Sequence, residues 1–172
     1  MGLIKRSEDI MQDTKDDEVL ATVAASPGRR GLGIVSLSML GVLLLYVALA
    51  TPPALGWQIF LVLTGAGVIW LANALRLATS HQIELTETEL RDTSGVVIAR
   101  VEDIASIDRG FFAFKPSNGF LLRTKTPGPR TWHPGMWWRF GRQIGVGGMT
   151  PGHQSKLMSE IIAVILARRE MG

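Results

Sequence analysis

The chain of 172 residues contains no cysteine. Disulfide bonds, a thiolate nucleophile and metal sites built on cysteine are therefore excluded. Histidine is scarce as well, because only His81, His133 and His153 occur, and no two of them have the i, i+4 spacing of a helical zinc site. We accordingly expect no bound metal.

Charge is missing from a long part of the chain, since no charged residue occurs between Arg30 and Arg76. The segments 31–50 and 56–75 are each 20 uncharged, mostly apolar residues, which is the length of a helix that crosses a bilayer. We predict two transmembrane helices, over about 31–50 and 56–76, joined by a short hairpin at 51–55. A cleavable signal peptide would begin earlier and have a shorter apolar core.

The orientation follows from the positive charges that flank these segments. Arg29 and Arg30 precede the first helix and Arg76 follows the second, whereas the hairpin carries no charge. Positive residues stay on the cytoplasmic side, so we expect a multi-pass inner-membrane protein with both termini in the cytoplasm. Residues 1–28 carry an acidic excess through Ser26 and show no sustained apolar period, which predicts a flexible tail, with a short helix near 17–25 as the alternative.

Residues 79–172 form the predicted cytoplasmic domain. Short alternating runs predict strands near 81–86, 88–93 and 96–100, one through Ile104 and Ile107, and further strands at 111–114, 120–125 and in WWRF and RQIGVGG, with a loop at 126–130. A C-terminal helix over about 151–169 would begin after Thr150, and its apolar stripe consists of Leu157, Ile161, Val164 and Ile165. The expected fold is an α+β domain in which about seven strands form a small curved antiparallel sheet or barrel, closed by the helix.

The stretch ELTETELRDTSGVVIARVEDIASIDRG resembles the opening of bacterial pleckstrin-homology-like domains, including the step from Ile104 to Ile107. IGVGGMTPGHQSKLMSEIIAVIL is similar to their last strand and closing helix. Such domains often follow a pair of membrane helices, and PGPRTWHPG departs from their pattern. The resemblance covers roughly residues 81–169, and it implies a fold and a membrane-proximal binding or assembly role rather than an activity.

Catalytic signatures are weak throughout. Glu87 and Glu89 share one strand face, a spacing that exposed carboxylates next to a turn also produce. IGVGGMTPG has Thr150 in place of the third glycine of a dinucleotide loop, and no strand with a ribose-binding acid follows. We therefore expect no enzyme activity, no catalytic residue and no cofactor.

Aromatic and basic residues gather near residues 123–142, within a stretch that has no acid between Asp108 and Glu160. We predict a membrane or partner contact surface with at least one of Trp137 and Trp138 exposed, because adjacent strand residues point to opposite faces. Tryptophan and arginine also suit the headgroup layer. The predicted contact residues are Trp132, Trp137, Trp138, Arg130, Arg139, Arg142, Arg123 and Lys125.

The expected function is non-enzymatic scaffolding, assembly or accessory-subunit work on a membrane protein complex. Its partners would be the lipid bilayer and a membrane protein or a second copy of the chain. The alternative is a sensor of anionic lipid headgroups, and an enzyme with an unrecognised site is a distant third. Nucleic acid is not expected, because the net charge is only +3 and the domain is tethered to a membrane.

Overall fold

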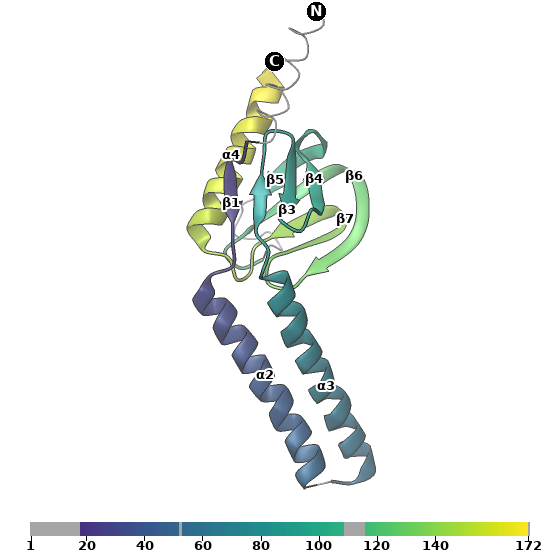
Figure 1. Ribbon diagram of the computed structural model, residues 1–172. Helices are drawn as coiled ribbons and strands as arrows, with labels where there is room; N and C mark the ends of the chain where they lie inside the picture. Colours follow the sequence, from purple (N-terminus) through teal and green to yellow (C-terminus); the bar gives the residue numbers. More distant parts are fainter. Residues whose placement is uncertain (1–17, 52, 109–115, 172) are drawn as a thin grey trace, which may run out of the picture.

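The computed structural model describes residues 18–51, 53–108 and 116–171 (Figure 1). Two long helices project from one end of a domain that is built from two sheets and a helix. The elements, in chain order, are β1 (Ala21–Val23), α2 (Pro27–Ala50), α3 (Leu55–Ala78), β2 (Ile83–Leu85), β3 (Glu89–Asp92), β4 (Val97–Arg100), the 3₁₀ turn η1 (Val101–Asp103), β5 (Ile104–Asp108), β6 (Phe120–His133), β7 (Trp137–Val146) and α4 (Gly152–Met171).

The helices α2 and α3 form an antiparallel pair with a close crossing point. A side chain on Gly41 would lie 3.1 Å from the carbonyl oxygen of Gly65, and a side chain on Gly65 would lie equally close to that of Gly41. The two glycines therefore allow backbone contact, as small residues do between membrane helices. Ala66 and Gly67, which adjoin Gly65, are exposed instead.

Both helices are long and apolar enough to cross a membrane, and only 11% of the most apolar 18 residues of each lie buried. Large apolar side chains such as Leu32, Met39, Tyr46, Leu63 and Trp70 are exposed along their length. A core helix of a water-soluble protein buries such residues, so these helices are not core helices of the domain.

Residues 21–23 correct the prediction of a flexible tail. They form β1, an edge strand that pairs antiparallel with β2 through Ala21↔Leu85 and Val23↔Ile83. The alternative helix near 17–25 is also wrong, and residues 27–28 already belong to α2. The helical hairpin is thus inserted between the first two strands of the domain, whose described part consists of residues 18–26, 79–108 and 116–171. Residues 1–17 lie outside the described part.

Two antiparallel sheets, β1-β2-β3-β4 and β5-β6-β7, build the domain. The expected strands near 81–100 and through Ile104 and Ile107 are present as β2 to β5. The predicted loop at 126–130 is wrong because β6 continues through it, with irregular register around Gly128, and the WWRF and RQIGVGG segments are one strand, β7. Residues 111–114 lie outside the described part.

The core lies between the sheets and is covered by α4. In the described residues the two sheets do not close into one barrel. Helix α4 buries Met158 and Ile162, while Leu157 and Val164 are about half exposed. The predicted apolar stripe is therefore confirmed in part, because Ile161 and Ile165 pack against the core whereas Leu157 and Val164 face away from it. Buried side chains from both sheets include Val23, Ile83, Leu85, Leu90, Ile98, Ile104, Phe120, Leu122, Trp137, Ile144 and Val146.

Candidate functional site

The end of the domain that faces the hairpin is held by contacts on both helices. The backbone N–H of Ser26, just before α2, donates to the carbonyl of Met149 at 2.8 Å, and the Arg29 guanidinium donates to the carbonyl of Thr150 at 3.4 Å. A side chain on Gly135, in the β6–β7 turn, would lie 3.0 Å from Leu75 of α3. The β6–β7 turn therefore lies at the base of the hairpin, where Arg29, Arg30 and Arg76 also lie (Figure 1).

Aromatic side chains gather on the outer face of the β6–β7 ribbon. Trp132 pairs with Trp138 across the two strands, and the Trp138 and Phe140 ring centroids are 5.2 Å apart. The Arg130 guanidinium carbon lies 4.6 Å from the centre of the Phe140 ring, within the range of a cation–π contact. Trp132 is 52% exposed and Phe140 is 40% exposed. We call Arg130, Trp132, Trp138 and Phe140 the aromatic face.

Trp137 points the other way and belongs to the core. It is 2% exposed, its indole N–H donates to the Asp92 carboxylate at 3.4 Å, and its ring stacks on His133 with centroids 4.6 Å apart. Trp137 is therefore not available as a contact residue, which corrects its place in the predicted surface. Trp138, its neighbour in sequence, lies on the outer face and is half-buried because its ring covers Gly145.

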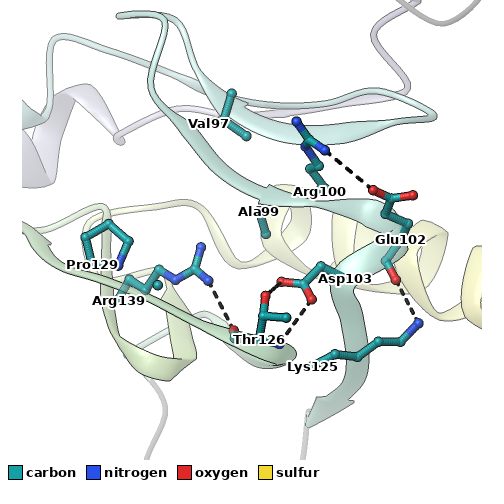
Figure 2. A pocket seen from close by; sticks show the side chains of 10 residues that line it. Val97, Ala99, Arg100, Glu102, Asp103, Lys125, Thr126, Pro129 and Arg139 are labelled. Atoms are coloured by element: carbon teal, nitrogen blue, oxygen red, sulfur yellow. Dashed lines mark hydrogen bonds and ion pairs between the residues drawn. The ribbon is translucent and has the colours of Figure 1, made fainter.

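The side chain of Arg139 links the two sheets. Its Nη1 donates to the carbonyl of Ile98 on β4 at 2.7 Å, and its Nη2 lies 3.5 Å from the carbonyl of Thr126 on β6 (Figure 2). Gly128 leaves room for the guanidinium, since a Cβ at that position would clash with it. Arg139 thus fastens the outer edge of one sheet to the ribbon of the other, and its role as a contact residue stays a prediction.

The open seam between the sheets is a cleft of about 670 Å³ beside Arg139 (Figure 2). The Asp103 carboxylate accepts hydrogen bonds from the backbone N–H and the hydroxyl of Thr126, at 3.1 and 2.7 Å. Lys125 donates to the backbone carbonyl of Glu102 at 2.9 Å, and Arg100 lies 3.7 Å from the Glu102 carboxylate. These charged groups hold the seam together.

The eight predicted contact residues are therefore divided among different places. Arg130, Trp132 and Trp138 lie together on the aromatic face, and Arg123 and Arg142 are exposed on β6 and β7. Lys125 and Arg139 line the seam, and Trp137 is in the core.

Glu87 and Glu89, the carboxylates considered for acid–base chemistry, have different surroundings. Glu89 lies 3.7 Å from the guanidinium of Arg91, while Glu87 is exposed. In the described residues no group of three or more potential metal ligands is found. These observations offer no catalytic pair in this part of the chain.

Sequence reasoning missed a cluster of polar residues at the base of the domain. Asp92 is 3% exposed, and its carboxylate accepts a hydrogen bond from the backbone N–H of Ser94 at 2.7 Å and lies 3.9 Å from Nδ1 of His81. Burial lowers the pKa of His133, while the Asp92 carboxylate raises it and His81 lowers it again. His81 and His133 are 52 positions apart in the sequence, so spacing could not have shown that they line one pocket.

No family model, curated protein or solved structure matches this chain.

Proposed function

We propose that the chain is an integral inner-membrane protein whose domain lies in the cytoplasm. The support is physical: both helices have the length and composition of membrane spans, and their large apolar side chains are exposed rather than buried. Arg29, Arg30 and Arg76 lie at the domain end of the hairpin, and by the positive-inside rule this charge supports a cytoplasmic location of that end.

A reporter enzyme that is active only in the periplasm tests this topology. Fused after Gly172 it should be silent, and inserted after Ala54, in the hairpin, it should be active. The opposite pattern would place the domain outside the cytoplasm.

The domain is proposed to be of the pleckstrin-homology-like kind. A four-stranded and a three-stranded antiparallel sheet with a C-terminal helix packed on them support this assignment. The insertion of the hairpin between β1 and β2 differs from the expected order, in which the helices precede the whole domain.

The function that we favour is non-enzymatic scaffolding or accessory-subunit binding on a membrane protein complex. The observation that carries it is an apolar groove of about 770 Å³ along α4. Leu157 and Val164 are 54% and 52% exposed there, and Arg168 and Arg169 line one end of the groove. Exposed apolar side chains bordered by charge are typical of a protein-binding site. Helix α4 runs away from the hairpin toward its C-terminus (Figure 1), and the groove is lined by side chains of its residues 157–169 together with Leu20 and Glu87.

Purification of the full chain from its native membrane in mild detergent tests this function. A partner protein should follow at fixed stoichiometry, identified by mass spectrometry, and Val164→Glu should remove it. His153→Glu, at an exposed position of the same helix outside the groove, is the matched control and should retain the partner. If no protein follows at fixed stoichiometry, or if both variants behave alike, the scaffolding function is contradicted.

Recognition of anionic lipid is the second candidate, and the aromatic face is the observation that favours it. Arg130 and Trp132 are exposed, and Trp132 lines a pocket with Trp70 and Leu77 of α3, near which a cytoplasmic headgroup layer would lie. Since the chain has no cysteine, Phe140→Cys can carry a single environment-sensitive fluorophore.

In nanodiscs, the emission of this label should shift to the blue with anionic lipid but not with neutral lipid, and high salt should reverse the shift. Ser106→Cys, exposed on β5, is the control position. The same emission in both lipids would contradict lipid recognition by the aromatic face.

A further inference from the structure

A pocket of about 270 Å³ lies where α3 meets the domain. One wall is helical and the other comes from the start of the domain, the β3–β4 turn and the β6–β7 turn. The lining residues are Trp70, Ala74, Leu77 and Ala78 of α3, together with His81, Ser94, Trp132, His133 and Pro134. The pocket is separate from both the α4 groove and the seam between the sheets.

The helical wall is apolar and continuous with the outer surface of α3. Trp70 is 64% exposed and Leu77 is 54% exposed, whereas the small side chain of Ala74 lies between them along the helix. Trp70 is eight residues from the end of α3 at Ala78, which corresponds to about 12 Å along the helix axis. The apolar wall therefore runs from the end of the helix into the depth at which the acyl chains of a bilayer begin.

The domain wall carries polar groups that can donate hydrogen bonds. His81 and His133 each contribute an imidazole, and Trp132 contributes an indole N–H. The Asp92 carboxylate does not line this pocket, since it is 3% exposed and accepts hydrogen bonds from the N–H groups of Ser94 and Trp137. The polar end of the pocket is therefore lined by groups that can donate hydrogen bonds, and the Asp92 carboxylate lies behind it, 3.9 Å from Nδ1 of His81.

We propose that this pocket binds one phospholipid molecule from the cytoplasmic leaflet. Its phosphodiester accepts hydrogen bonds from the imidazoles of His81 and His133, and one acyl chain lies along the groove at Ala74. The pocket matches the two parts of a phospholipid. Its polar donors lie toward the domain, where the headgroup would bind, and its apolar wall lies toward the bilayer, where the acyl chain would lie. The volume is below the roughly 300–1,000 Å³ of ordinary small-molecule sites, so it admits a headgroup-sized part of a ligand whose chains remain outside.

This inference rests on the proposed membrane insertion of α2 and α3. Native mass spectrometry of the full chain in mild detergent, with added phosphatidylglycerol and phosphatidylethanolamine, should show one phospholipid retained per chain after partial delipidation. Ala74→Trp fills the groove and should abolish retention. Ala66→Trp, at an exposed position of the same helix away from the pocket, should retain the lipid as the parent does.

Two more variants distinguish a loss of lipid binding from a loss of folding. Ala74→Leu adds less volume and should still weaken retention, and His133→Phe keeps a ring to stack on Trp137 but removes the donor. A hydrogen bond to a charged acceptor is lost in His133→Phe, so lipid retention should fall by about tenfold or more. Thermal unfolding of each variant should stay cooperative.

Several results would overturn the proposal. Equal retention in Ala74→Trp and Ala66→Trp would show that the lipid binds elsewhere on the helices. Competition by millimolar inorganic phosphate would show that the site takes a free anion and not a lipid. Membrane insertion is measured separately, by resistance of the chain to extraction with alkaline carbonate. Extraction of the parent chain would overturn the proposed function, whereas loss of lipid from an inserted parent chain would overturn only this site.

Discussion

Removing β1 should unfold or strongly weaken the domain, although β1 and the rest of the domain are separated by the whole hairpin. The fragment 79–172 lacks β1, whereas a rejoined chain would carry residues 18–26, a flexible linker and residues 79–172. Packed helices are about 8–10 Å apart. A Gly/Ser linker of about ten residues, with a root-mean-square span of roughly 16–19 Å, is therefore long enough to replace α2 and α3.

The magnitude follows from what β1 buries and bonds. Val23 is fully buried, which contributes about 1.5–3 kcal/mol to stability, and Ala21 is 7% exposed and adds less. Three hydrogen bonds at 2.8–3.0 Å also tie this segment to the domain, at about 1 kcal/mol each; their donors are the backbone N–H groups of Leu20, Ala24 and Ser26. The sum is about 5 kcal/mol, comparable with the lower end of the roughly 5–15 kcal/mol by which domains are stable.

Chemical denaturation followed by tryptophan fluorescence measures this difference, because Trp137 is buried in the folded domain. The rejoined chain should unfold cooperatively, and fragment 79–172 should unfold at much lower denaturant or without a cooperative transition. Val23→Asp in the rejoined chain should reproduce the loss, while Thr22→Ala, at an exposed position of the same strand, should not. If the fragment and the rejoined chain share one midpoint, β1 is dispensable and the reasoning fails.

Three further perturbations test other parts of the structure. Arg139→Gln should lower the free energy of unfolding by about 2 kcal/mol, because the charged hydrogen bond to the Ile98 carbonyl on β4 is lost. Arg142→Gln, exposed on the same strand, should change it by less than about 0.5 kcal/mol, and equal effects would contradict the fastening role. The domain should lose stability as the pH falls below 6.5, because the unfolded state then binds a proton that folded His133, with its lowered pKa, does not. Denaturation of His133→Gln should show a smaller pH dependence, and an unchanged one would refute this assignment. Gly65→Leu should destabilise the hairpin by about 1–3 kcal/mol through overpacking, as measured by thermal unfolding in detergent, whereas Ala66→Leu should be tolerated.

Much of the architecture could be predicted because its signals are local. Apolar runs of 20 residues specify helices of membrane length without reference to the rest of the chain. Short apolar and polar runs likewise predicted β2 to β5, and in β2 and β3 the buried residues alternate along the strand. The aromatic face was foreseen in part, because strand geometry requires Trp137 and Trp138 to point to opposite sides.

Sequence periodicity did not predict the secondary structure of segments that form strands by pairing with distant parts of the chain. β1 has only three residues, too few for a pattern, and it becomes a strand because β2, some 60 positions later, offers a free edge. The Pro- and Gly-containing segment at 126–130 continues β6 because the irregular register of the β6–β7 ladder accommodates it. A turn was the local preference, and pairing with β7 overrode it.

The sequence by itself determined that the chain contains two apolar helices of membrane length, a series of strands after them and a C-terminal helix. Tertiary structure alone decided which of two adjacent tryptophans is buried, that Arg139 fastens two sheets, and that His81 and His133 line one pocket beside α3. The reason is that hydropathy and period are properties of a segment. Folding brings distant residues together. These residues determine which face of a strand is buried and which group a charged side chain contacts.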